Sequence, residues 1–184
     1  MSDAAGGALP PVAFRDAPRD ISAQKMGRKM GRRALILGLL ALAGCGGGRG
    51  GAGMPPGLGR NGLYPNETPH LRSRINYWAR HYEVPAELVQ RVVLRESGHR
   101  PELRNGPYYG LMQLHPQTAR TMGFRGAPAQ LLDADTNLRY GVRYLRGAWL
   151  VAEGDPDRTI HWYSRGYYYE AKRKGLLKKT GLKS

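Results

Sequence analysis

Acidic residues are scarce in this sequence. Its 184 residues include 14 Asp and Glu against 29 Lys and Arg, which leaves a formal net charge of +15. Such an excess of one sign favours a polyanionic surface or substrate as the partner, without indicating which one. The length allows one domain of ordinary size plus appendages.

Cysteine is almost absent, and so are long hydrophobic runs. The single cysteine, Cys45, excludes an intramolecular disulfide and needs another explanation. The apolar run at residues 34–43 is far too short to span a bilayer as a stable helix. A basic segment precedes this run and contains Lys25, Arg28, Lys29, Arg32 and Arg33. A basic segment followed by a short apolar one is typical of a secretory signal.

The apolar run ends in Leu42-Ala43-Gly44-Cys45, which resembles a bacterial lipobox. In such a signal, small residues precede a cysteine that is acylated and becomes the mature N-terminus. We therefore expect residues 1–45 to be a signal peptide that ends in a lipidated Cys45, and the mature protein to be anchored by lipid in the cell envelope. The alternative is a free cysteine at the end of an ordinary signal peptide.

The segment before Met26 is long for the start of a signal peptide, so Met26 or Met30 is an alternative start of the chain. If Cys45 is the mature N-terminus, 22 Lys and Arg minus 11 Asp and Glu leave a charge of +11. The basic character is therefore not a property of the signal alone. A secreted protein is also an unfavourable candidate for nucleic-acid binding, although anionic envelope polymers and lipid head groups remain accessible to it.

Glycine and proline dominate residues 46–66, which show no periodic apolar pattern, so we expect a flexible linker there. Residues 67–184 then form one domain with a basic C-terminal tail. No part of this domain alternates with a period of two, which predicts an all-α fold. Capping and proline signals predict helices that begin near Thr68, Pro85, Pro116, Asp133 and Asp155.

The helix predicted from Pro85 carries a carboxyl group in an unusual position. Its apolar stripe consists of Leu88, Val89, Val92 and Val93. Glu96 continues this stripe near the C-terminal end of the helix, where burial and the partial negative charge of the last carbonyls both raise a carboxyl pKa. A carboxylic acid that keeps its proton near neutral pH suits general acid catalysis. The alternative is a solvated glutamate paired with Arg95 or Arg100.

Four motifs occur in order along the chain. They are Glu96-Ser97, then Gly110-Leu111-Met112-Gln113-Leu114, then Asp133 with Asn137-Leu138, Gly141 and Tyr144-Leu145, and finally Tyr163 with Gly166. In this combination residues 71–175 resemble the Slt-type lytic transglycosylases. The resemblance implies a goose-lysozyme-like α fold and non-hydrolytic cleavage of peptidoglycan between N-acetylmuramic acid and N-acetylglucosamine, which leaves a 1,6-anhydromuramoyl end. Several members of this family are outer-membrane lipoproteins, so we expect the periplasmic face of that membrane as the location.

The sequence departs from the family pattern at four places. His99 stands where the family has an aromatic residue, and His115 stands where a methionine is frequent. Pro107-Tyr108-Tyr109 replaces the small residues before the Gly-Leu-Met-Gln motif. The family's Ala-Tyr-Asn-Ala-Gly motif is here Trp162-Tyr163-Ser164-Arg165-Gly166. The glutamate, the glutamine and the tyrosine are retained, so we expect the chemistry to be kept and the shape of the subsites to differ.

The resemblance also implies roles for single residues. Glu96 would be the catalytic acid and base, and contacts with the substrate would come from Ser97, Tyr109, Met112, Gln113, His115 and Tyr163. Gln113 would bind acetamido groups or sugar hydroxyls, Tyr163 would place its hydroxyl near Glu96, and Met112 would shape the floor of the site. The structural alternatives are that Gln113 caps a loop and that Tyr163 belongs to the core.

A second catalytic carboxylate is missing. Glycoside hydrolysis normally uses two carboxyl groups, yet the only acid between Ser97 and Leu132 is Glu102. Attack by the substrate's own 6-hydroxyl removes the need for a positioned water, so one group can serve twice. Asp133 and Asn137 we interpret as helix-capping residues. Trp78 would suit stacking on a sugar, but its place on a helical stripe favours the core.

Neither a cofactor nor a metal is expected, because the histidines show no metal-ligand spacing. The expected partners are peptidoglycan strands and, through Cys45, a membrane; we expect a monomer that does not bind nucleic acid. The basic tail is either a solvated face or a site for peptide carboxylates or anionic lipid, and contains Lys172, Arg173, Lys174, Lys178 and Lys179. Two rival functions stay open: a goose-type lysozyme that hydrolyses the same bond, and a lipoprotein that binds glycan without cleaving it.

Overall fold

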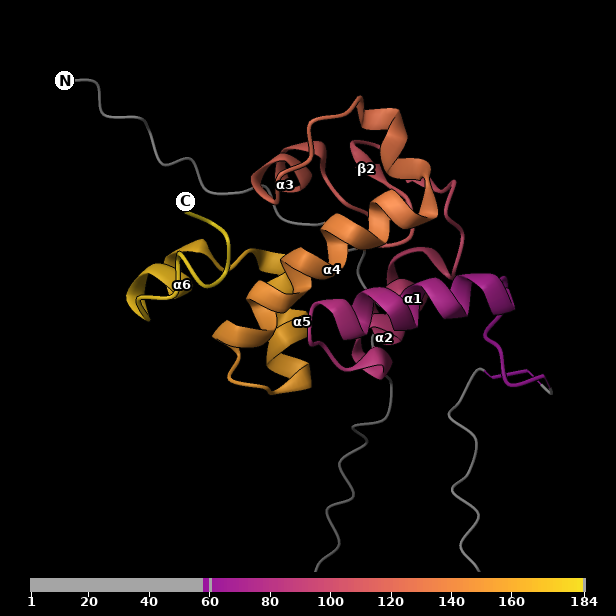
Figure 1. Ribbon diagram of the computed structural model, residues 1–184, viewed down its shortest axis with the longest axis horizontal. Coiled ribbons are helices and arrows are strands. Elements are labelled where there is room, and N and C mark those ends of the chain that lie inside the picture. The colour runs from indigo at the N-terminus through magenta and orange to yellow at the C-terminus, as the bar shows by residue number, and fades with distance from the viewer. Residues whose placement is uncertain (1–57, 60, 184) are drawn as a thin grey trace, which may run out of the picture. The chain divides into compact units, whose positions relative to one another are not determined.

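The computed structural model describes residues 58–59 and 61–183. The predictions for Cys45, for the signal peptide and for residues 46–57 of the linker lie outside these residues. The described part is mainly helical, with helices α1 (Pro69–His81), α2 (Ala86–Ser97), α3 (Pro116–Thr121), α4 (Ala134–Val151), α5 (Pro156–Arg165), α6 (Tyr168–Arg173) and a 3-10 helix η1 (Pro128–Leu132) (Figure 1). The predicted all-α, lysozyme-like fold is confirmed.

A small hairpin interrupts the segment that was predicted to be only a loop. Strand β1 (Arg104–Asn105) pairs antiparallel with β2 (Tyr108–Tyr109). A bridge from Tyr109 to Leu114 extends this pairing into the Gly-Leu-Met-Gln segment. The short strands therefore fix the path of the chain just before that motif.

The starts of the helices agree with the signals in the sequence. The side chains of Thr68, Asp133 and Asp155 each accept a hydrogen bond from the backbone N–H three residues later. These bonds satisfy donors that the first helical turn leaves without a partner. His115 caps α3 through Nδ1, which accepts from the backbone N–H of Gln117, two residues later. Helix α2 differs, because its N-cap is Pro85, which has no capping side chain.

Helix α4 is the centre of the fold and packs against α1, α3, α5 and η1 (Figure 1). Two glycines on its buried face allow close approach of neighbouring side chains. A Cβ atom at Gly141 would collide with Met112, and one at Gly147 would collide with the phenol of Tyr167. In the core, the ring of Tyr144 on this helix packs edge-on against Tyr163 and at a tilt against Tyr167.

The two ends of the predicted domain are packed more closely than expected. Residues 61–66, assigned above to the linker, form turns, and Asn66 donates from Nδ2 to the carbonyl of Gly98 over 3.0 Å. In the basic tail, Lys174 donates to the carbonyl of Val151 and pairs with Glu153. The tail begins within the last turn of α6, next to Ala171, which is fully buried. It is therefore only partly a solvated face.

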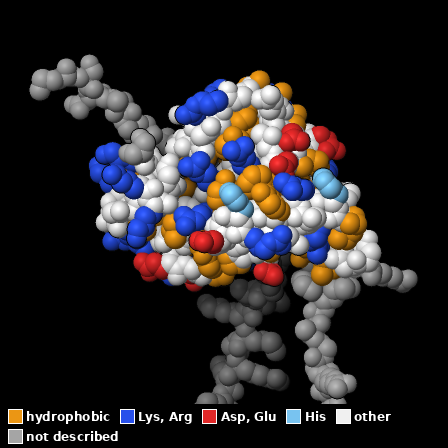
Figure 2. Space-filling model, in the orientation of Figure 1, with side chains coloured by type: hydrophobic (Ala, Val, Ile, Leu, Met, Phe, Trp, Pro, Cys, Tyr) orange, Lys and Arg blue, Asp and Glu red, His pale blue; other side chains and the backbone are white. Residues whose placement is uncertain are grey.

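Basic side chains are spread over the molecular surface, mixed with hydrophobic ones, on the face drawn in Figure 2. In residues 58–59 and 61–183, no helix has both the length and the apolar composition needed to cross a membrane.

Candidate active site

Glu96 lies in the last turn of α2 and is half-buried. Burial raises its pKa to about 7, and the guanidinium of the neighbouring Arg95 opposes this shift. No acidic group of the described residues contributes to the shift. Near neutral pH this carboxyl group therefore still binds a proton, as a general acid must.

Tyr163 lies on α5 and is almost fully buried, with 1% of its surface exposed. Its hydroxyl donates a hydrogen bond to the backbone carbonyl of Met112 over 2.8 Å. Burial raises the pKa of Tyr163 well above its usual value, and the charge of Glu96 adds to this rise. Tyr163 is thus a core residue with a satisfied hydroxyl and also an electrostatic neighbour of Glu96. It links the Gly-Leu-Met-Gln segment to the helix beside that carboxyl group.

Asn137, on the buried face of α4, holds the same segment from the other side. Its Nδ2 donates to the carbonyls of Tyr109 and Leu131, each over 2.8 Å, and its Oδ1 accepts from the N–H of Met112 over 2.9 Å. The interpretation of Asn137 as a capping residue is therefore wrong, whereas that of Asp133 is confirmed. A polar amide within an otherwise apolar helical stripe was the signal in the sequence for this role.

Gly110 is required at its position by close approach and by backbone conformation. It has a φ of 70°, and a Cβ there would collide with the side-chain amide of Asn137. Gln113 ends the same turn with a φ of 44°, which is unusual for a residue with a side chain. The Gly-Leu-Met-Gln sequence thus forms a tight turn, whose unusual backbone conformation is maintained by the contacts around it.

The side chain of Gln113 is buried within this turn. Its Nε2 donates to the carbonyls of Leu103, over 3.1 Å, and Gly110, over 2.9 Å. Its Oε1 is buried and has no hydrogen-bond partner among the described residues. The alternative that Gln113 caps a loop therefore explains the two bonds that its Nε2 donates. Its Oε1 is the one side-chain atom of Gln113 left as an acceptor.

Two of the residues predicted to contact substrate have buried side chains. The hydroxyl of Ser97 donates back to the carbonyl of Val93 over 3.2 Å, and only 2% of the residue is exposed. Met112 has no exposed surface, because its side chain packs against α4 at Gly141. Direct contact of these two side chains with substrate does not agree with the structure. Met112 instead contributes its carbonyl, which accepts from Tyr163.

The two other predicted contact residues, Tyr109 and His115, are half-buried. The guanidinium of Arg104 lies over the ring of Tyr109, 4.9 Å from its centre. His115 packs edge-on against Tyr108, with ring centres 5.7 Å apart, and burial lowers its pKa. Both rings flank the Gly-Leu-Met-Gln turn and remain accessible to a ligand.

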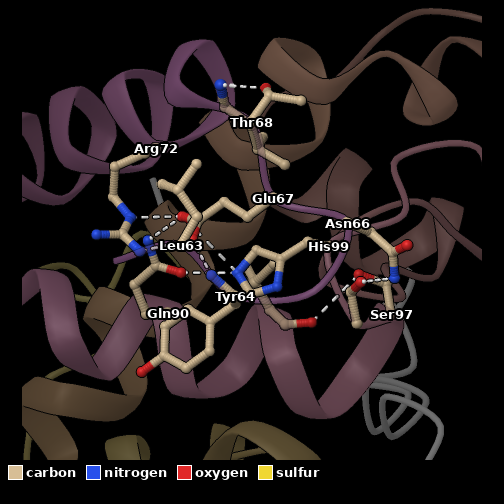
Figure 3. A network of polar contacts seen from close by, with 12 residues as sticks. Leu63, Tyr64, Asn66, Glu67, Thr68, Arg72, Gln90, Ser97 and His99 are labelled. Atoms are coloured by element: carbon tan, nitrogen blue, oxygen red, sulfur yellow. Dashed lines mark hydrogen bonds and ion pairs between the residues drawn. The ribbon is translucent and has the colours of Figure 1, made fainter. Parts of the chain in front are cut away.

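A buried polar network that joins α1, residues 64–67 and α2 was not found from the sequence (Figure 3). Glu67 is 7% exposed, and its carboxylate accepts hydrogen bonds from Arg72, Gln90 and the N–H of Tyr64. Burial alone would raise the pKa of Glu67, but these donors and the charge of Arg72 hold it below its usual value. This second buried carboxyl is therefore an anion with a complete set of partners.

His99 completes the network three residues after Glu96. Its Nε2 lies 2.7 Å from Oε1 of Gln90, and its ring stacks on Tyr64 with centres 5.3 Å apart. Burial lowers the pKa of His99, so the neutral ring donates from Nε2. His99 thus stacks as an aromatic ring does, and it ties the end of α2 to residues 64–72.

The family model of the transglycosylase SLT domain matches residues 73–176, more than half of the chain. The chain belongs to the transglycosylase SLT domain family. The match contains the helix with Glu96, the turn with Gln113 and the helix with Tyr163. No solved structure matches the chain. This SLT domain therefore acts on peptidoglycan, with an activity of the lytic transglycosylase type.

The SLT domain has a cavity of about 750 Å³ beside these helices, between α2 and α5. A second cavity, of about 770 Å³, lies between α1 and the start of α4 and is lined by aromatic and charged side chains. The described residues contain no group of three or more His, Cys, Asp and Glu that could hold a metal ion.

Proposed function

We propose that this SLT domain cleaves the bond between N-acetylmuramic acid and N-acetylglucosamine without water, with Glu96 as the only acid and base. One observation carries the proposal: the pKa of Glu96 is raised to about 7 by burial, and no carboxylate of the described residues acts on it. A hydrolase would need a second carboxylate to activate water or attack the sugar. Glu67 does not fill that role, since Arg72 and Gln90 occupy its oxygens.

The reaction balances with a single carboxyl group. Protonated Glu96 gives its proton to the glycosidic oxygen, the bond from that oxygen to C1 of the muramoyl residue breaks, and positive charge develops at C1. The 6-hydroxyl oxygen of the same sugar then bonds to C1, and its proton passes to the carboxylate of Glu96. Because the nucleophile is tethered to the ring, the attack is intramolecular. Glu96 ends protonated, ready for the next turnover.

Two neighbours support this cycle. Tyr163 donates to the carbonyl of Met112, and the charge of Glu96 acts on its hydroxyl, so Tyr163 ties the turn to the surroundings of the acid. Gln113 supports the turn from within: its Nε2 donates to the carbonyls of Leu103 and Gly110, and its side chain is as buried as those of Ser97 and Met112. Both residues therefore position the turn near the acid rather than contact the sugar.

Mass spectrometry of the released muropeptides tests the proposal. Purified peptidoglycan digested by the protein should yield muropeptides with 1,6-anhydro ends, each lighter by one water than a hydrolysis product. Glu96→Gln should abolish release, while Glu87→Gln, an exposed glutamate on the same helix, should leave it unchanged. Products with ordinary reducing ends would instead identify a lysozyme. Binding to peptidoglycan with no product would identify a non-catalytic binding protein.

We also propose that Cys45 carries the lipid that anchors this domain in the cell envelope. The proposal is supported by Leu42-Ala43-Gly44-Cys45 and by the basic and short apolar segments before it. Labelling of cells with a radioactive fatty acid should mark the wild-type protein and not the Cys45→Ser variant. Label that persists in the variant would contradict the assignment.

A further inference from the structure

A small cavity lies between the C-terminal half of α4, the end of α1 and residues 178–181. Its volume is about 200 Å³, below the range of roughly 300–1,000 Å³ that is usual for sites of drug-sized molecules. Half of the residues that line it are cationic and none is acidic; the cations are Arg143, Arg146, Lys178 and Lys179. The cavity therefore suits a small anion.

The four cations have little compensation by anions within the protein. Nη2 of Arg146 lies 3.7 Å from Oε2 of Glu83, whose side chain is 82% exposed, and such an exposed contact contributes little energy. Within residues 58–59 and 61–183, no acidic side chain forms an ion pair with Arg143, Lys178 or Lys179. Because like charges around one small cavity repel one another, an anion bound there would offset an unfavourable interaction.

The other cations of the basic tail are arranged differently. Arg173 pairs with Glu170, and Lys174 pairs with Glu153. These two charges are neutralised beside α6. The lysines at positions 178 and 179 instead line the cavity together with the arginines of α4. The tail thus has a neutralised part and a part that contributes to a cationic site.

Both arginines of the cavity are held by backbone carbonyls. Nη1 of Arg143 donates to the carbonyl of Met122 over 2.8 Å, and Nη1 of Arg146 donates to that of Lys179 over 3.3 Å. A guanidinium group has five N–H groups, so each arginine keeps several donors for a ligand. Since these bonds orient the two groups, the donors are in place before a ligand arrives.

The segment that carries the two lysines is folded as well. Thr180 has 4% of its surface exposed, and its Oγ1 donates to the carbonyls of Leu176 and Leu177 over 3.0 and 3.1 Å. The side chains of Leu176, Leu177 and Leu182 pack against the hydrophobic core. The backbone of residues 178–181 is therefore anchored on both sides, and the lysines extend from a fixed position.

The number of cations indicates the kind of anion. A carboxylate carries one charge on two oxygens, whereas the phosphate group of a monoester carries about 1.5 to 2 negative charges at pH 7 on three acceptor oxygens. Guanidinium groups bind such oxygens in pairs, and ammonium groups add point charges. Two guanidinium and two ammonium groups around one small cavity therefore match a phosphate group better than a carboxylate.

We propose that this cavity binds a terminal phosphate group, from free phosphate or from a phosphomonoester lipid head group, and that the four cations hold its oxygens. None of Glu96, Gln113 and Tyr163 lines the cavity, so the site is separate from the candidate active site and does not rest on the proposed cleavage. If the phosphate belongs to a lipid, this face of the domain lies on a membrane, which the anchoring proposed for Cys45 allows.

Titration with inorganic phosphate at constant ionic strength tests the site. The protein is the full chain with Cys45→Ser, which cannot carry the proposed lipid. Phosphate should cause saturable shifts of the amide NMR signals of Thr180 and Gly181, which line the cavity. Acetate should bind more weakly, because it brings one charge instead of nearly two.

A pair of double variants separates the cavity from the net charge of the tail. Lys178→Gln with Lys179→Gln should raise the Kd for phosphate about tenfold, the effect of losing two exposed charge contacts. Lys172→Gln with Lys183→Gln removes the same charge from exposed positions of the same tail that do not line the cavity, and should leave the Kd unchanged.

Vesicles of phosphatidylcholine with and without phosphatidate distinguish the two sources of phosphate. Binding that needs phosphatidate, and that the cavity variant loses while the control variant keeps it, would identify a lipid head group. Equal vesicle binding by both variants would identify free phosphate. The basic segment at residues 25–33 is present in every protein, so the comparison isolates the cavity. No saturable shift with phosphate, equally tight binding of acetate, or an equal rise of Kd in both variants would overturn the proposal, whatever the vesicles show.

Discussion

Glu96 lies at the buried end of a helix, where burial favours the protonated form of its carboxyl group. Burial raises the pKa of Glu96 to about 7, so the protonated form that the proposed first step requires declines above that pH. We expect kcat/KM to fall tenfold per pH unit well above about pH 7. Rates measured on solubilised peptidoglycan from pH 5 to pH 9 check this, and a fall that begins only near pH 5 would contradict it.

The same burial predicts a change in stability. Between the unfolded pKa near 4.3 and the folded pKa of about 7, the folded state binds more protons, so the free energy of unfolding decreases as pH rises through this window. In the Glu96→Gln variant residue 96 does not titrate, so the variant keeps its free energy of unfolding over this pH window. We expect the variant to match the wild type at pH 4 and to exceed it by roughly 2 kcal/mol at pH 8.5, after allowance for partial exposure. Urea unfolding at both pH values measures the difference.

Asn137 makes three hydrogen bonds in a place with no exposed surface. Asn137→Ala leaves the N–H of Met112 and two carbonyls without these partners, at a cost of about 3 kcal/mol. Since these groups belong to the turn that carries Gln113, activity should fall more than the fraction of folded protein does. Thermal unfolding and muropeptide release, measured together, separate the two effects. Asp133→Ala, which removes only a cap, should cost about 1 kcal/mol and leave activity intact.

At the scale of single residues, the sequence was sufficient to predict the raised pKa of Glu96 but not the hydrogen bonds of the residues around it. The position of Glu96 on an apolar stripe predicted the raised pKa, because both follow from one helix. The bonds of Asn137 depend on chain segments 25 and 28 residues away, and those of Glu67 include one to Gln90, 23 residues away. Periodicity within a helix carries no information on such partners.

Helices with local start signals were predictable, and those without them were not. Thr68, Asp133 and Asp155 combine a capping side chain with a following apolar stripe, and α1, α4 and α5 begin there. Helix α6 has no side-chain cap, and its sequence is a short run of tyrosines and charges. It exists because Tyr167, just before it, enters the core and donates to the carbonyl of Tyr144 over 2.9 Å. That tertiary contact, rather than helix propensity, fixes the element.

The contact between α4 and Tyr167 predicts the outcome of Gly147→Ala. Helix propensity alone would favour alanine by about 1 kcal/mol. The new methyl group would collide with the phenol of Tyr167, which is buried and hydrogen-bonded, and such overpacking costs about 1–3 kcal/mol. We expect a net loss of stability and a partial release of α6. Thermal unfolding detects the first and amide exchange in α6 the second; Arg139→Ala, on the exposed face of α4, should change neither.

Over the whole molecule, the two buried carboxyl groups act on stability in opposite directions. Glu96 has a raised pKa and weakens the fold as pH rises, whereas Glu67 has a lowered pKa and contributes stability that is lost as pH falls. The first is the acid of the proposed reaction, and the second attaches residues 61–68 to α1 and α2. A boundary at residue 67, as predicted from composition, cuts through this attachment.

A truncation series tests the attachment. A chain that starts at residue 68 lacks Glu67, so Arg72 loses its ion pair and the amide of Gln90 loses an acceptor; we expect a loss of about 3 kcal/mol relative to a chain that starts at residue 58. Glu67→Gln in the longer chain should reproduce most of this loss at pH 7 and a smaller part of it in acid, because the pKa of the wild-type carboxyl is lowered and its stabilising charge is lost as pH falls. Equal stability of all three proteins at pH 7 would show that the network does not support the end of α2, and hence does not position Glu96.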